Sequence, residues 1–253
     1  LISLYRNGDL QEALREGEAL AGFFPESPVI QNLLGAINVG LGNIEQALSR
    51  YAAALKLNPS YAQAHYNLGS ALNSIGDPEA AILSYAAALK IKPNYAEAHN
   101  NLGNALRNAG KLKEAIVSYE TALQLKPNSA DAHFNLGNAL YDTGQSEEAL
   151  QSYTQATSIN PNRKDFWQSL SHLLANINFT SYSENISDIF IEILEQKTVV
   201  RPIGIATQIL NLLKFHPEYG GLFQNNKDSN VLNSVEIICR RLARIPLFLR
   251  IIE

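Results

Sequence analysis

The chain has 253 residues, of which 46% are hydrophobic, and its formal net charge is −4. The apolar content suffices for a substantial core, while the slight acidity gives no reason to expect nucleic acid or an anionic membrane as a partner. Cys239 is the single cysteine, so an internal disulfide framework is excluded and we expect a reducing, cytoplasmic location. No apolar run reaches the roughly 18 residues that a membrane-spanning helix needs.

Glycine, alanine, tyrosine and proline recur along the chain with a fixed period of 34 residues. One glycine series comprises Gly35, Gly69, Gly103 and Gly137, and one tyrosine series comprises Tyr51, Tyr85, Tyr119 and Tyr153. Residues 62–95 and 96–129 are identical at more than half of their positions. Such a period indicates a repeat array, in which each unit packs mainly on its neighbours.

In chain order, the pattern predicts a partial unit followed by four complete ones and then a half-unit. These segments are 1–27, 28–61, 62–95, 96–129, 130–163 and 164–177. Each complete unit reads as two amphipathic helices, which in the clearest unit span 96–109 and 113–125. Gly110 should end the first helix in a left-handed conformation, and Pro127 should end the second. Gly103 and Ala115 are expected where the two helices cross closely.

The period stops after Arg163, although a helical rhythm continues to the last residue. Helices are expected near 184–197, 202–215, 229–244 and 246–253, and the apolar content of 178–253 suits a cap over the end of the array. Because the chain contains no methionine, we interpret it as a fragment of a longer protein, in which 178–253 is truncated.

The small residues at the eighth, twentieth and twenty-seventh places, the aromatic at the twenty-fourth and the proline at the thirty-second resemble the tetratricopeptide repeat. The resemblance implies an all-α fold, a right-handed superhelical solenoid of helix-turn-helix repeats followed by a C-terminal helical capping region. It also implies a scaffold that binds a protein or peptide, without identifying the partner.

In such a solenoid the first helix of each unit forms the inner wall, so the residues of that wall are the candidate site. Asparagine fills the sixth place of three successive units, and a carboxamide can pair with both the N–H and the C=O of a peptide backbone. We therefore predict an extended peptide in an asparagine-rich groove, with interspersed aromatics adding apolar contact. The predicted peptide-binding residues are Tyr66, Asn67, Asn100, Asn101, Asn104, Arg107, Phe134, Asn135, Asn138 and Tyr141. The alternative is that these asparagines only bridge neighbouring helices.

The asparagine row is similar to that in the repeat arm of O-linked N-acetylglucosamine transferases, and residues 96–104 carry the resemblance. The resemblance implies that the row holds substrate peptides. The row is interrupted in residues 28–61, where Leu33 fills the sixth place and Asn32 lies one place off.

Chaperone-tail adaptors of the same repeat class use inward basic residues to clamp a terminal carboxylate. The corresponding places here hold Tyr66, Glu97, Asn100, Asp131 and Asn135, so we exclude that function.

Two other candidates have structural explanations. His65, His99 and His133 recur at the fourth place, where Trp167 stands in the following half-unit, so we expect ring packing and not metal ligation. Cys239 lies in an apolar helical stretch and is interpreted as a buried small hydrophobe. Because no phosphate loop, metal-ligand spacing or nucleophile–base motif occurs, we expect no cofactor, no metal and no catalytic residue in this fragment.

Three functional hypotheses remain open from the sequence. The first is a protein–protein interaction scaffold that binds an extended peptide. The second is the substrate-recruiting arm of a larger enzyme, a glycosyltransferase resembling O-linked N-acetylglucosamine transferase or a methyltransferase that uses S-adenosylmethionine, whose catalytic domain is absent. The third is self-association through the groove or the terminal helices.

Overall fold

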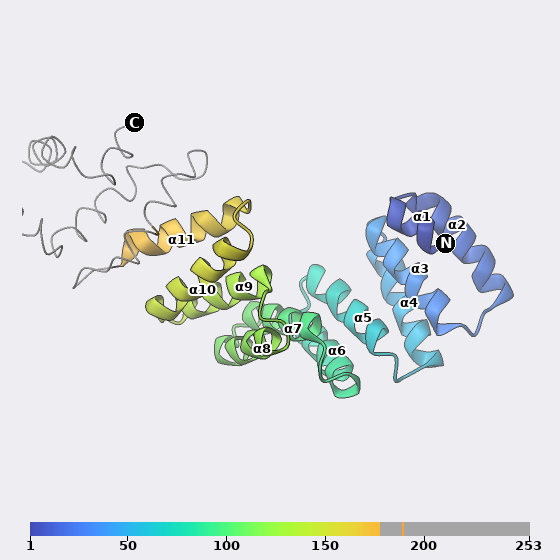
Figure 1. Ribbon diagram of the computed structural model, residues 1–253. Helices are drawn as coiled ribbons and strands as arrows, with labels where there is room; N and C mark the ends of the chain where they lie inside the picture. The colour runs from blue at the N-terminus through green and yellow to red at the C-terminus, as the bar shows by residue number, and fades with distance from the viewer. Residues whose placement is uncertain (178–188, 190–253) are drawn as a thin grey trace, which may run out of the picture. The chain divides into compact units, whose positions relative to one another are not determined.

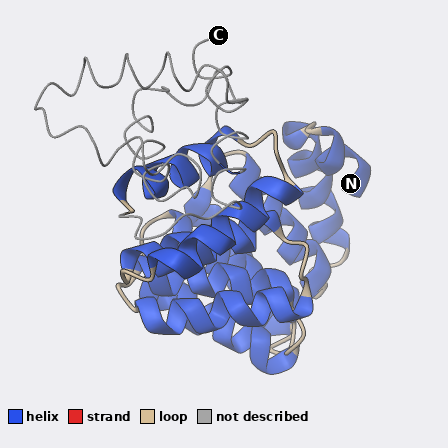
Figure 2. Cartoon of the chain, turned by 60° about the vertical axis from the view of Figure 1, so that its left-hand side comes forward, coloured by secondary structure: helices blue, strands red, loops and turns tan. Residues whose placement is uncertain are grey.

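The computed structural model describes residues 1–177 and Ile189, and the regular elements of this part of the chain are all α-helices, joined by short turns and loops (Figure 2). The expected all-α class is confirmed. The helices are α1 (Ile2–Asn7), α2 (Leu10–Phe23), α3 (Pro28–Gly40), α4 (Ile44–Leu57), α5 (Ala62–Ser74), α6 (Pro78–Ile91), α7 (Ala96–Asn108), α8 (Leu112–Leu125), α9 (Ala130–Asp142), α10 (Ser146–Ile159) and α11 (Lys164–Asn176). Within the described residues, none of these helices is long and apolar enough to cross a membrane. The helices expected between 184 and 253, and Cys239, lie outside the described residues.

The chain divides into two compact units, Leu1–Ala139 and Leu140–Glu253. In the first unit, the two helices of a repeat pack on each other, as α3 does on α4, α5 on α6 and α7 on α8 (Figure 1). The second helix of one repeat packs in turn on the first helix of the next, as α4 does on α5 and α6 on α7. In the second unit, α10 packs on α11. Sequence neighbours are thus neighbours in space, which is the defining property of a solenoid.

Local sequence signals set the ends of these helices. The Ser27 hydroxyl accepts a hydrogen bond from the Ile30 N–H (3.4 Å), and the Asp77 carboxylate accepts one from the Ala80 N–H (3.0 Å). Both caps precede a proline in the first helical turn. The N–H that proline lacks would have no acceptor within the helix at this position, so no hydrogen bond is lost. Gly110 has a φ of +74° and follows the end of α7, as the sequence predicts.

In the repeats at 28–61, 62–95 and 96–129, a glycine of the first helix lies against a tyrosine ring of the second. A Cβ atom on Gly103 would lie 2.5 Å from Cε1 of Tyr119, and one on Gly69 would lie 2.9 Å from Tyr85. Both tyrosines are fully buried. The expected close crossing at Gly103 is therefore present, and the residue that faces this glycine is Tyr119.

The joint between repeats is held by the ring at the fourth place. The Nε2–H of His99 donates to the carbonyl oxygen of Pro93 (2.9 Å), and His65 and His133 make the same bond to the proline six residues earlier. In the second unit, Trp167 donates from its indole nitrogen to the carbonyl oxygen of Pro161 (2.7 Å). Because imidazole and indole fill one role at the same place, the histidine period is explained by packing and a structural hydrogen bond.

Candidate functional site

In the first unit, the first helices of successive repeats carry their fifth-, sixth- and ninth-place residues on one side. We call this side the amide face. It comprises Asn32, Tyr66, Asn67, Asn100, Asn101, Asn104, Phe134, Asn135 and Asn138. The sixth and ninth places share a helix side because they are three residues apart. Most of these side chains are partly exposed, so they combine contact with the protein and access from solvent.

A ladder of hydrogen bonds runs along the amide face from repeat to repeat. The sixth-place carboxamide of each repeat donates to the fifth-place residue of the preceding repeat. Asn67 donates to Asn32 Oδ1 (2.9 Å), Asn101 to the Tyr66 hydroxyl (3.0 Å), and Asn135 to Asn100 Oδ1 (3.1 Å). Each bond spans one repeat plus one residue. The asparagines therefore do bridge neighbouring helices.

The ladder also explains the residue that interrupts the asparagine row. Asn32 is at the fifth place of its repeat, one position before Leu33, and it is the acceptor for Asn67. Only 8% of Asn32 is exposed, so the bond also satisfies a polar group that is largely removed from water. Asn32 thus belongs to the ladder as an acceptor, which the sixth-place pattern alone does not reveal.

The carboxamides differ in how much hydrogen-bonding capacity the ladder uses. Asn67 and Asn101 are engaged at both ends, because their oxygens also accept from Gln63 Nε2 (2.9 Å) and Asn100 Nδ2 (3.3 Å). Asn104 accepts from the Tyr119 hydroxyl (2.8 Å), and its Nδ2 has no hydrogen-bond partner among the described residues. Asn135 donates to Asn100, and within the same part of the chain its Oδ1 accepts from no residue.

Two successive repeats of the amide face therefore present one unused hydrogen-bond donor, Asn104 Nδ2, and one unused acceptor, Asn135 Oδ1. A carboxamide nitrogen carries two N–H groups and its oxygen two lone pairs, so the unused atoms of Asn104 and Asn135 can each bind a ligand without breaking the ladder.

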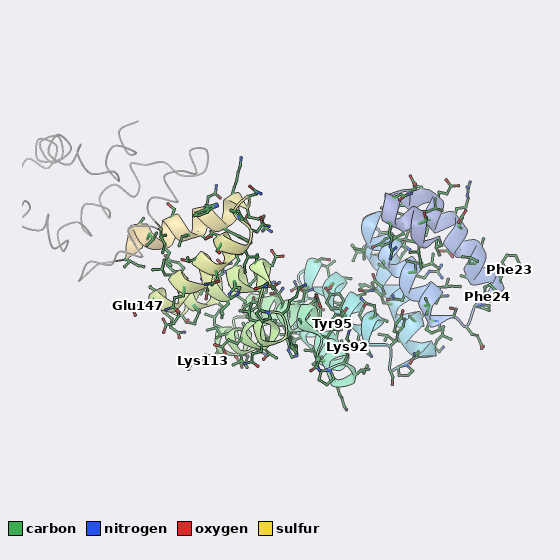
Figure 3. All side chains as sticks on the ribbon, viewed as in Figure 1. Phe23, Phe24, Lys92, Tyr95, Lys113 and Glu147 are labelled. Carbon is green, nitrogen blue, oxygen red and sulfur yellow. The ribbon has the colours of Figure 1, made fainter. Side chains whose placement is uncertain are left out.

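Beside the carboxamides lies a cluster of tyrosines. The ring centroid of Tyr66 is 5.0 Å from that of Tyr95 and 5.9 Å from that of Tyr85. The Tyr95 hydroxyl donates to Gln63 Oε1 (2.9 Å), and Lys92 Nζ lies 4.3 Å from the centre of the Tyr95 ring (Figure 3). Burial raises the pKa of Tyr66 and brings that of Tyr85 to about 12, so both are neutral phenols at physiological pH.

Sequence reasoning missed Tyr95 and Lys92. The sequence did contain a signal for Tyr95. Tyrosine occupies the last place of two successive repeats, because Tyr61 and Tyr95 are 34 residues apart.

A pocket of about 230 Å³ opens on the amide face between α5, α7, the end of α8 and the start of α9. Its lining residues are Tyr66, Ala96, Glu97, Asn100, Asn101, Ala122, Lys126, Ser129 and Asp131. Lys126 Nζ donates to Glu97 Oε1 at 3.2 Å, and both side chains are more than half exposed. The backbone N–H of Glu97 and then Lys126 lower the pKa of the Glu97 carboxyl, so this group is ionised at neutral pH.

The remaining predicted residues are divided between the units. Arg107, Phe134 and Asn138 are half-buried in the first unit, and each already makes an interaction. Tyr141 belongs to the second unit, where its ring packs edge-on against His172 with a centroid distance of 5.8 Å. The predicted residues of the first unit other than Arg107 thus lie on the amide face, while Tyr141 is described with the other unit.

Comparison with known protein families matches four repeat models to this chain. The model described as TPR repeat matches residues 103–144, and models described as tetratricopeptide repeat match 32–96, 84–117 and 130–163. No curated protein sequence matches the chain.

Several solved structures share the fold. A crystal structure of MamA is 26% identical, covers 63% of this chain and 93% of its own, and has a TM-score of 0.58. MamA from Desulfovibrio magneticus RS-1 is 24% identical, with 64% and 91% covered and a TM-score of 0.59. YrrB, described as a TPR protein with an unusual peptide-binding site, is 19% identical, with 76% and 97% covered and a TM-score of 0.61. At the identities of the last two, the similarity shows the fold alone.

Proposed function

Residues 32–163 are tetratricopeptide repeats, a scaffold for protein interaction, and we propose that this chain binds an extended peptide segment of a partner protein along the amide face. The partner segment would lie across successive first helices, with its backbone paired to the carboxamides. This mode of binding reads the backbone more than the side chains, so it tolerates variation in the partner sequence.

The observation that carries the proposal is the pair of unused groups on the amide face. An extended peptide offers an N–H and a C=O at each residue, which match the Asn135 oxygen and the Asn104 nitrogen respectively. These two asparagines are in successive repeats, so one segment that crosses both repeats can use both. The carboxamides that are fully engaged in the ladder would position the helices and would contribute less to the peptide.

Two further features support the proposal. Tyr66 and Phe134 are partly exposed at the fifth place of two repeats, where their rings offer apolar contact to side chains of the segment. YrrB, which has the same fold, is described as having a peptide-binding site.

The test uses peptides selected on the 253-residue chain from a random peptide display library, labelled and titrated by fluorescence anisotropy. The double variant Asn104→Ala/Asn135→Ala should weaken binding about tenfold or more, because each lost hydrogen bond costs roughly 0.5–1.5 kcal/mol. Asn94→Ala is the matched control, since Asn94 is exposed in the turn between α6 and α7. Wild-type affinity in the double variant would contradict the proposed role of the amide face.

A second measurement separates backbone pairing from charge attraction. Binding through neutral carboxamides should change little between low and physiological salt, because screening acts on charged pairs. A steep loss of affinity across that range would contradict backbone pairing as the main contact.

A further inference from the structure

The outer side of α6 carries a straight row of exposed residues with an apolar centre. The row consists of Glu79, Leu83, Ala86 and Lys90, whose spacings of four, three and four residues place them on one side of the helix. Leu83 is 73% exposed. The helix packs against α5 and α7, and these four residues are left exposed by that packing. We call them the α6 stripe. None of them belongs to the amide face, which is formed by first helices of the repeats.

The corresponding places of the other second helices are more polar. They hold Gln11, Arg15, Glu18 and Gly22 in α2, Glu45, Ser49, Ala52 and Lys56 in α4, Lys113, Val117, Glu120 and Gln124 in α8, and Glu147, Gln151, Thr154 and Ser158 in α10. A serine thus replaces Leu83 in α4, and a glutamate replaces Ala86 in α8. A single exposed leucine is ordinary on a protein surface. Among the second helices of residues 1–177, however, only α6 combines an apolar centre with end charges of opposite sign.

The order of residues makes the α6 stripe complementary to a reversed copy of itself, because spacings of four, three and four read the same in both directions. If two copies of α6 lie antiparallel, Glu79 of one faces Lys90 of the other. Leu83 of one copy then faces Ala86 of the other, so a large side chain meets a small one and the helices can approach closely. Each contact occurs twice, as a two-fold symmetric interface requires.

The charges at the two ends of the stripe are available for such a contact. Glu79 is in the first turn of α6 and Lys90 in the last. They are about 16 Å apart along the helix axis, so they do not pair with each other. Within residues 1–177 and Ile189, neither has an ion-pair partner. The helix dipole accounts for the sign of each charge, as it does for the same two charges in α4, but it does not account for the exposed Leu83 between them.

We propose that the α6 stripe is the contact surface of a homodimer, in which a second copy of this chain packs its own α6 antiparallel across it. Since each copy contributes one helix, the contact is smaller than the interfaces of stable complexes, and the dimer should form only at high protein concentration. The amide face stays open in this dimer. Two amide faces would be joined in one particle, which strengthens the binding of a partner that carries two suitable segments.

The first test is sedimentation velocity of the full 253-residue chain from about 10 µM to about 1 mM, the range in which a weak dimer forms. The weight-average mass should rise from that of a monomer toward that of a dimer. Leu83→Ser introduces the residue that α4 has at this place, and it should weaken the dimer at least tenfold. Lys56→Glu is the matched control, because Lys56 is the exposed lysine of α4 that corresponds to Lys90. It should dimerise like the wild type.

The second test exchanges the end charges to identify the antiparallel pairing. Glu79→Lys and Lys90→Glu each place like charges at both ends of the contact, so each variant alone should dimerise at least fivefold more weakly at low salt. In an equimolar mixture of the two, every end contact joins a lysine to a glutamate. The mixture should therefore associate at least fivefold more tightly than either variant alone.

Three results would overturn the inference. The first is a monomer at every concentration. The second is a dimer that Leu83→Ser leaves at wild-type strength, and loss of that dimer in Asn104→Ala/Asn135→Ala would place the contact on the amide face instead. The third is a mixture of the two charge variants that associates no more tightly than either alone. Circular dichroism checks that each variant keeps its helix content, and the charge variants test the contact independently of Leu83.

Discussion

The contacts inside a repeat and the contacts between repeats on the amide face are built from different chemistry. Inside a repeat, Gly103 lies so close to the buried Tyr119 ring that there is no room for a methyl group. Between repeats, the partly exposed carboxamides of Asn101 and Asn135 bond to residues of the preceding repeat. A close-packed core leaves no room for a larger side chain, whereas hydrogen-bonding groups at the surface can also bond to a ligand. The first kind of contact therefore sets the fold, and the second is suited to binding.

The largest effect is expected for Gly103→Ala. The added Cβ would lie 2.5 Å from Tyr119 Cε1, and such overpacking costs about 1–3 kcal/mol of unfolding free energy. Gly22→Ala is the control, because Gly22 lies in α2 with no atom within 4 Å of the added Cβ. The control should be neutral or more stable by up to about 1 kcal/mol. Urea unfolding measures both, and equal stabilities would show that the glycine–tyrosine contact does not limit helix approach.

A smaller effect is expected at the joint between repeats. His99→Ala removes the ring that donates to the Pro93 carbonyl and should cost about 1–2 kcal/mol, from the lost hydrogen bond and ring packing. His99→Trp should lie within about 0.5 kcal/mol of the wild type, since Trp167 makes the same bond to Pro161. Thermal unfolding of the two variants checks this, and a tryptophan variant as unstable as the alanine one would contradict the shared role of the two rings.

The smallest effect is expected on the ladder itself. A double-mutant cycle of Asn32→Ala and Asn67→Ala should give a coupling energy of about 0.5–1.5 kcal/mol, because the two side chains share one hydrogen bond of 2.9 Å. The pair Asn67 and Asn104, which are not hydrogen-bonded to each other and lie in different repeats, should be additive. Additivity in the first cycle would mean that the ladder contributes nothing to the joint.

The repeat and its helices were predictable because side-chain size and backbone conformation act locally. The left-handed Gly110 and the run of buried positions in α7 and α8 are both readable from residue type and spacing. The helix pairs and the all-α class follow from that spacing. The peptide-binding role of the asparagines stays a prediction, which the variants above address.

The ladder itself was not predictable from the period. Its bonds join residues that are one repeat plus one position apart. The partner of a sixth-place asparagine is therefore the fifth-place residue of the preceding repeat and not another sixth-place residue. A search for recurring residues treats Asn32 as misplaced and does not identify Tyr66 as a hydrogen-bond acceptor, although both are acceptors in the structure. The pocket was missed for a related reason, because Lys126 follows a second helix and comes near Glu97 only after the repeats stack.

The spacing of the ladder bonds has a consequence for how such a chain can change its length. Removal of residues 96–129 as a block would leave Asn135 one repeat plus one residue after Tyr66, whose hydroxyl already accepts from a sixth-place amide. Donor and acceptor would still match across the new junction, as they would after duplication of the same block. This unit can therefore be deleted or duplicated as a block while each joint of the ladder keeps a hydrogen-bond donor and a matching acceptor.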